Sequence, residues 1–205
     1  MAIEYNFSLN ELILPIVNAD IFRTNFHGAE IKVVTYNEVP PNVMEWFEVE
    51  SEMFLFKDYK RGAFKELFAI QHNSGDITYA AQQIKEYPVI MATGHPEIDL
   101  VEDLVYLKDL NRYGEETGYG EIIKEAKEEI PYVGYTMTKD EYRRQGFGKR
   151  RLLMMNGLSK MLFGLPLYSG ISFGHPDAKS LWEKLVAERK ALKYKEDKKD
   201  RFRFI

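Results

Sequence analysis

The chain has 205 residues, of which 45% are hydrophobic and 14% aromatic, and its formal net charge at pH 7 is −4. This size and apolar content suit one core, so we expect residues 1–205 to form a single domain. The absence of cysteine excludes disulfides, a thiol nucleophile and thiolate metal sites. The N-terminus lacks a signal-peptide pattern and no apolar run approaches the roughly 20 residues of a membrane span, so we expect a soluble, cytoplasmic protein.

The first quarter of the chain predicts two helices around one strand. A capping-box pattern indicates a helix over residues 8–22. Residues 30–39 have the β-branched content of a strand and are followed by two prolines. A short helix should then run over residues 42–49, with Trp46 and Phe47 in the core.

The next stretch predicts two more helices, over residues 58–71 and 76–86. The sequence His72-Asn73-Ser74-Gly75 between them is typical of a turn. Residues 87–93 indicate a strand, and residues 94–97 a turn.

Residues 98–107 fit two patterns equally well. Their apolar positions suit a helical stripe, but a strand pairing back on residues 87–93 is the alternative, and periodicity leaves both open. After a turn near Gly114 we expect a loop over residues 115–119 and a helix over residues 121–129.

The second half of the chain is clearer. Residues 131–138 have the aromatic and β-branched content of a strand, and residues 148–163 form a long apolar helical run. Residues 167–173 predict a second strand, parallel to the first because a helix connects the two. A helix over residues 176–190 follows.

A basic glycine loop lies between the first of these strands and its helix. The N–H groups in the first turn of a helix are unpaired and carry partial positive charge, which favours anionic phosphates. Gly146 and Gly148 allow a ligand to approach the backbone closely, while Phe147 can turn back into the core. The loop also carries a cluster of cations, Arg143, Arg144, Lys149, Arg150 and Arg151.

The segment Arg143-x-x-Gly146-x-Gly148 resembles the Arg/Gln-x-x-Gly-x-Gly/Ala acyl-CoA signature of the GNAT superfamily of N-acetyltransferases. The resemblance extends over roughly residues 130–195. It implies a GNAT-like acyl-CoA N-acyltransferase fold of mixed α/β class, with a central sheet flanked by helices. Residues 130–205 would form the acyl-CoA-binding half, and residues 1–129 a divergent acceptor-side half.

The resemblance also implies a function. The protein would transfer an acetyl group from acetyl-CoA to an amine acceptor by direct attack in a ternary complex. The acetyl carbonyl would bind the backbone near Met137 or Thr138. The residues expected to hold the cosubstrate are Met137, Thr138, Arg143, Arg144, Gln145, Gly146, Phe147, Gly148, Lys149 and Arg150.

An amine with an ordinary pKa near 10.4 must lose a proton before it attacks a thioester, so a base is required. His175 and Asp177 follow the second predicted strand and should lie near the chemistry. Both have an ordinary alternative, because His175 can be a turn residue before proline and Asp177 a helix N-cap. Glu97 and His95 are further candidates for the base.

The sequence departs from the family at the group that protonates the leaving thiolate. Trp182 occupies the position where the family often has a tyrosine, and an indole N–H is not a practical acid. Tyr168 or another residue replaces it, water does so, or the protein has lost acetyl transfer.

The four histidines have no i, i+4 pair, and we predict no metal. An acidic stretch over residues 97–129 and basic stretches over 139–151 and 189–203 suit a cationic acceptor and CoA phosphates, although solvated helix faces explain the acidic stretch equally well. We expect no membrane partner. Many GNAT proteins form homodimers, and the oligomeric state stays open.

Two alternatives to an amine acetyltransferase remain. A nucleic-acid base modifier would use the basic C-terminal stretch for phosphates, but acidic residues at 196, 197 and 200 interrupt it. A non-catalytic GNAT-like module would bind acyl-CoA or a protein without turnover, and Trp182 supports that possibility. The loop lacks a P-loop pattern, and no Gly-x-Ser-x-Gly elbow indicates a serine hydrolase.

Overall fold

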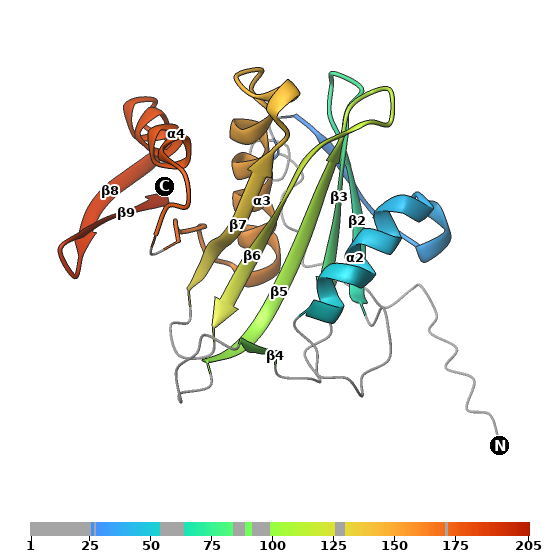
Figure 1. Ribbon diagram of the computed structural model, residues 1–205, viewed down its shortest axis with the longest axis horizontal. Helices are drawn as coiled ribbons and strands as arrows, with labels where there is room; N and C mark the ends of the chain where they lie inside the picture. The colour runs from blue at the N-terminus through green and yellow to red at the C-terminus, as the bar shows by residue number, and fades with distance from the viewer. Residues whose placement is uncertain are drawn as a thin grey trace.

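The computed structural model describes residues 26, 28–53, 64–83, 89–91, 99–125, 130–170 and 172–205. The described chain is a mixed α/β protein, as expected. It consists of a main sheet, a two-stranded hairpin and three α-helices (Figure 1). The helices are α2 (Pro41–Met53), α3 (Phe147–Phe163) and α4 (Pro176–Ala187), and two short 3-10 helices are η1 (Tyr36–Glu38) and η2 (Asp140–Tyr142).

The main sheet is built from strands that are neighbours in sequence. They follow the order β1-β2-β3-β5-β6-β7, every pair is antiparallel, and β4 adds to β5 beyond the end of β3. Short turns after Gln71 and Leu110 connect β2 to β3 and β5 to β6 as hairpins. The strands are β1 (Glu30–Val34), β2 (Phe64–Gln71), β3 (Ile77–Gln83), β4 (Val89–Met91), β5 (Asp99–Leu110), β6 (Glu116–Glu125) and β7 (Pro131–Thr138).

A second hairpin, β8 (Ala191–Glu196) with β9 (Lys199–Phe204), is linked to β7 through Tyr168. The N–H of Tyr168 donates to the carbonyl of Pro131, and its carbonyl accepts from the N–H of Val133, both at 2.9 Å. On its other side the segment bonds to β9, where the N–H of Ser169 donates to Phe202. The bridge between Tyr132 and Tyr168 is parallel, so the expected parallel direction is confirmed.

The two faces of the main sheet are covered by different helices (Figure 1). On one face, Val43, Met44 and Phe47 of α2 pack on strand residues that include Leu67 and Tyr106. On the other face, α3 packs on Phe68, Ile70, Val105 and Ile122, and this core continues to α4 and the second hairpin. The central strands are therefore buried on both sides.

Several predictions are confirmed. The expected strand at 131–138 is β7, and the helices expected at 42–49, 148–163 and 176–190 are α2, α3 and a shorter α4. The turns at 72–75 and near Gly114 are present, and Phe47 is fully buried. The strand option for residues 98–107 is right, since β5 pairs with β4.

The helices expected at 58–71 and 76–86 are wrong, because β2 and β3 occupy the described part of these ranges. In β2, Phe64, Leu67 and Phe68 have helical spacing. However, Leu67 faces the α2 core whereas Phe68 faces the α3 core. A strand buried on both faces loses the alternation that identifies it.

The loop and helix expected at 115–129 are also wrong, since β6 runs through most of that range. In β6, Gly118 and Gly120 have no side chains, and this makes room for Arg151 of α3. Among the described residues of the strand expected at 167–173, pairing is limited to the two bridges of Tyr168, one to Tyr132 and one to Arg203. The shorter η1 replaces the end of the strand expected at 30–39. The helix expected at 8–22 and the turn at 94–97 lie outside the described residues.

Candidate active site

The glycine loop begins α3 with an open helix N-terminus. Gly146 is the N-cap residue, in the left-handed region with φ 91°, and a Cβ there would have nothing within 4 Å. The N–H of Arg150 donates to the carbonyl of Gly146 at 3.0 Å. The N–H groups of Phe147, Gly148 and Lys149 precede this bond and have no acceptor within the helix. With the helix dipole, they form a site suited to an anion.

Local packing holds this loop against the end of β7. A Cβ on Gly148 would lie 3.3 Å from Oγ1 of Thr138, so the helix starts close to the strand. The ring of Phe147 contacts Tyr142 edge-on at 5.6 Å, and Phe147 is half-buried outside both core clusters, so its expected turn into the core stays a prediction. Arg144 takes φ 62°, a left-handed conformation that is uncommon for a non-glycine residue and helps the chain reverse.

One edge of β7 is open beside this loop. Lys139 N–H donates to Thr117 across the β6–β7 pair, and Met137 lies opposite Tyr119. In an antiparallel ladder the intervening residues point their N–H and C=O groups away from the partner. Thr136 and Thr138 therefore present theirs to the outer edge. Among the described residues, no strand pairs with that edge beyond the bridge at Tyr168.

Most charges at the mouth of the loop already have partners. Arg143 lies 2.9 Å from Asp140 and also approaches the carbonyl of Thr138 at 3.5 Å. Lys149 pairs with Glu188. Gln145 donates through Nε2 to the carbonyl of Glu141 at 2.7 Å. These contacts hold the loop in shape before any ligand binds.

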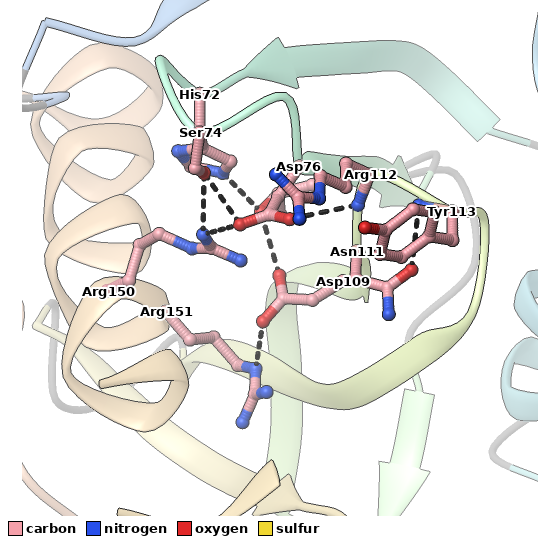
Figure 2. A network of polar contacts seen from close by, with 10 residues as sticks. His72, Ser74, Asp76, Asp109, Asn111, Arg112, Tyr113, Arg150 and Arg151 are labelled. Carbon is pink, nitrogen blue, oxygen red and sulfur yellow. Dashed lines mark hydrogen bonds and ion pairs between the residues drawn. The ribbon is translucent and has the colours of Figure 1, made fainter. Parts of the chain in front are cut away.

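Arg150 points away from the mouth, toward the turn between β2 and β3. Figure 2 shows it bonded to Asp76 and Ser74, while its guanidinium also lies 4.7 Å above the ring of Phe147. The expected role of Arg150 in binding phosphate stays a prediction, since its present partner is a carboxylate.

Arg151 is not at the mouth, contrary to the expectation that it adds charge there. Its side chain is 0% exposed and lies 2.8 Å from the equally buried Asp109 of β5 (Figure 2). It also donates to the carbonyl of Met137 and lies 3.2 Å from the hydroxyl oxygens of Thr136 and Thr138. Arg151 therefore supports β7 from beneath, because Gly118 and Gly120 let it approach the sheet.

The hydrogen bonds continue from Asp109 to His72. The hydroxyl of Thr78 donates to Asp109 at 2.7 Å, and Nε2 of His72 lies 2.9 Å from the same hydroxyl. The single proton of the Thr78 hydroxyl is already used in the hydrogen bond to Asp109. Nε2 of His72 therefore carries a proton and donates to the Thr78 oxygen. Burial lowers the pKa of His72 to about 4, with a smaller contribution from Arg150.

The predicted catalytic residues are separated. Tyr168 lies beside the start of β7, six residues or about 20 Å along the strand from Thr138. His175 is exposed and is the N-cap of α4, where Nδ1 accepts from the N–H of Asp177 at 3.2 Å. The N-cap alternative for Asp177 is therefore wrong, because His175 takes that place. The catalytic roles of all three residues stay predictions, and His95 and Glu97 lie outside the described residues.

Trp182 belongs to the core. It is 3% exposed and stacks on Phe202 with ring centroids 5.9 Å apart, and Phe204 lies 5.0 Å away. The indole of Trp182 is enclosed by these two rings, so its place in the structure is a packing position in the core.

A group that the sequence did not indicate lies on the α2 face of the sheet. Glu121 of β6 is flanked by Tyr119 and Tyr135. Its pKa is raised to about 7, mainly because the carboxyl group is buried and to a smaller extent because of the negative charge of Glu50. Burial is also the main cause that raises the pKa of Tyr119 to about 12, and Tyr135 adds to it. Residues 115–129 were expected to hold a loop and a helix, so the strand alternation that puts Glu121 on this face was hidden.

Among the described residues, no group of three or more potential ligands is placed to hold a metal ion. Within the same part of the chain, no helix has the length and apolar character needed to cross a membrane.

Comparisons with known proteins give likenesses of fold only. No family model matches the sequence, and neither does any curated protein. An acetyltransferase of the GNAT family from Staphylococcus aureus Mu50 superposes with a TM-score of 0.40 at 11% identity, over 85% of this chain and 98% of that chain. Nourseothricin acetyltransferase gives 0.38 at 9% identity, over 86% and 95%.

A protein assigned as an acyl-CoA N-acyltransferase from Klebsiella pneumoniae gives a TM-score of 0.34 at 13% identity, over 85% of this chain and 94% of that chain. All three TM-scores are below 0.5.

Proposed function

We propose that this protein is an N-acetyltransferase that transfers an acetyl group from acetyl-CoA to an amine. One observation carries the proposal: the open N-terminus of α3, begun by a left-handed Gly146, lies against the outer edge of β7, to which Thr136 and Thr138 present their backbone groups. A ligand with a pyrophosphate and an extended amide arm suits this pair of surfaces, and acyl-CoA is such a ligand.

The pyrophosphate would bind the N–H groups at residues 145–149, with Arg143, Arg144 and Lys149 around it. The amide arm would then run along β7 as an added strand does, exchanging hydrogen bonds with Thr136 and Thr138. Thr138 suits hydrogen bonds with this arm better than Met137 does, because Met137 faces β6 and its carbonyl accepts from Arg151. The acetyl carbonyl would then lie farther along β7, beyond Thr136.

The acid and base are separate assignments. His175, Asp177 and Tyr168 remain candidates, and single substitutions His175→Ala and Tyr168→Phe test two of them. A rate unchanged in both variants would exclude these residues from proton transfer.

The anion site formed by the glycine loop at the start of α3 is tested by Gly146→Glu, with Gly164→Glu as the matched control. Both glycines have positive φ and empty surroundings, at opposite ends of α3, so the two variants share the same backbone cost. Calorimetric titration with acetyl-CoA and with CoA, in moderate salt to screen charge attraction, should show one-site binding to the wild type. Gly146→Glu should weaken it at least tenfold, about 1.4 kcal/mol, because a carboxylate then occupies the anion site.

Equal affinity in the two variants, or no binding by the folded wild type, would contradict the proposal. Binding without turnover of any amine would instead favour the non-catalytic alternative, for which the buried Trp182 is the supporting observation.

A nucleic-acid base modifier is less favoured. Several cations of the C-terminal hairpin lie close to carboxylates: Lys193 is 3.0 Å from Asp200, and Arg201 is 3.3 Å from Glu196. Binding of single-stranded DNA or RNA that weakens steeply with salt would favour this alternative.

A further inference from the structure

Glu121 lies where β7 departs from regular pairing. Across the β6–β7 ladder Glu121 is opposite Tyr135, whereas the next residue, Ile122, is opposite Val133. Gly134 is therefore an extra residue in β7, a β-bulge. A bulge interrupts the row of backbone hydrogen bonds and redirects the neighbouring side chains.

The carboxyl group of Glu121 sits directly over this bulge. A Cβ on Gly134 would lie 2.7 Å from Oε1 of Glu121 and 2.3 Å from Cδ1 of Ile123. The absence of a side chain at Gly134 thus leaves room for the carboxyl group beside the backbone of β7. From Thr138 to Gly134 the strand covers about 13 Å. The extended arm of an acyl-CoA anchored at the glycine loop is long enough to bring its thioester to this point.

Aromatic rings surround Glu121 on the α2 face. The rings of Tyr119 and Tyr135 are 5.7 Å apart, and Trp46 of α2 lies 5.2 Å from Tyr119. Tyr135 is 50% exposed, so this cluster opens to solvent at the edge of the sheet. Ring faces attract an ammonium group, and here Lys108 already lies 4.9 Å above Trp46.

The charges around Glu121 come from three strands and α2. Burial is the largest cause that raises the pKa of Glu121 to about 7, and the charge of Glu50 adds to it. Burial also raises the pKa of Tyr106, with Glu121 and Glu50 contributing. The titratable groups facing this site are Glu50 of α2, Tyr106 and Lys108 of β5, Glu116 and Tyr119 of β6, and Tyr135 of β7, with Lys108 paired to Glu116 at 3.2 Å.

We propose that Glu121 is the group that accepts the proton of the acceptor ammonium, and that the acceptor enters over the rings of Tyr119 and Tyr135. This inference rests on the proposed acetyl transfer. The acceptor R–NH₃⁺ gives one proton to the Glu121 carboxylate, and the nitrogen lone pair attacks the thioester carbon. The C–N bond forms, the C–S bond breaks, the second nitrogen proton passes to the leaving sulfur, and Glu121 returns its proton to solvent.

The test compares Glu121→Gln with Glu45→Gln, a variant on the exposed side of the same helix α2 that faces this site. Initial rates of CoA release from acetyl-CoA would be measured with a panel of primary alkyl and arylalkyl amines. Glu121→Gln should lower kcat about 100-fold or more, while KM for acetyl-CoA and its calorimetric affinity stay within about twofold. Glu45→Gln should match the wild type.

Two further readouts separate proton transfer from a structural role. Hydroxylamine is largely unprotonated at pH 7 and needs no base, so Glu121→Gln should retain most of the wild-type rate with this nucleophile. Glu50→Gln removes a neighbouring negative charge, so the acid limb of the pH–rate profile should move from near pH 7 to lower pH.

An unchanged kcat in Glu121→Gln, or an equal loss with hydroxylamine and with alkyl amines, would overturn the assignment while leaving the transferase intact. An acid limb that does not move in Glu50→Gln would also count against it. Acetyl-CoA binding without turnover of any amine would overturn Glu121 as proton acceptor together with the transferase. Failure of the wild type to bind acetyl-CoA would overturn the assignment of the glycine loop as an acyl-CoA-binding site.

Discussion

His72 is a histidine that the fold keeps neutral. Its side chain is 7% exposed, and its pKa is lowered to about 4 by burial and by Arg150. An unfolded histidine has a pKa near 6.5 and binds protons first, so between pH 6.5 and 4 the unfolded state takes up more protons than the folded state. The corresponding stability is complete above pH 6.5 and is lost as the pH falls toward 4.

We therefore expect acidification from pH 7 to pH 4.5 to lower the free energy of unfolding through His72 by up to about 3 kcal/mol. Urea unfolding at a series of pH values measures the slope, and His72→Gln, which retains a donor for Thr78, should remove this component. Glu121, whose pKa is raised, contributes a slope of opposite sign between pH 4.5 and 7. Glu121→Gln should therefore steepen the fall on acidification, and identical profiles for the three proteins would contradict both assignments.

At the level of elements, the contact between α3 and the sheet depends on Gly118. A Cβ at this position would lie 2.2 Å from the carbonyl oxygen of Met137 and 2.1 Å from Nη2 of Arg151. The Met137 carbonyl belongs to the backbone of β7 and cannot shift without disturbing the sheet. Gly118→Ala should therefore destabilise the protein by about 1–3 kcal/mol. Urea unfolding would measure this loss. Gly174→Ala, where a Cβ meets nothing within 4 Å, is the control, and equal stability of the two variants would contradict the packing described here.

Gly118 also shows why the elements of the first half were hard to predict. Residues 115–119 were expected to form a loop, but Gly118 and Gly120 leave room in β6 for Arg151, which belongs to a helix far along the chain. Leu67 and Phe68 likewise read as a helical stripe, because cores on both faces of the sheet bury neighbouring positions. Strand β7, the glycine loop and α3 were predictable, since their signals are local. The position of Glu121 depends on the partner strand and its bulge, which no local pattern records.

At the scale of the whole molecule, the main sheet joins both halves of the sequence. Strands β1 to β6 come from residues 1–129, whereas β7 comes from the second half and pairs with β6. The α3 core then continues through Leu167 to Trp182 and Phe202. We expect these parts to unfold together as one cooperative unit.

The two tryptophans offer a direct test, because Trp46 packs against the α2 core and Trp182 lies in the α3 core. Trp46→Phe and Trp182→Phe each leave a single reporter. Fluorescence and far-UV circular dichroism should give coincident urea midpoints within each variant. Midpoints of fluorescence and circular dichroism that separate in either variant would show that the halves unfold independently.

The ion pairs at the mouth of the glycine loop have a kinetic consequence. At the mouth Arg143 faces Asp140 and Lys149 faces Glu188, while Arg150 turns away from the mouth to Asp76, so much of the loop's field is cancelled a short distance into solvent. Long-range steering of an anionic ligand requires an uncompensated field, which salt then screens. Encounter with a CoA ester should accordingly proceed at an ordinary diffusional rate that changes little with ionic strength, and selection would occur only on contact, when backbone N–H groups meet the phosphates.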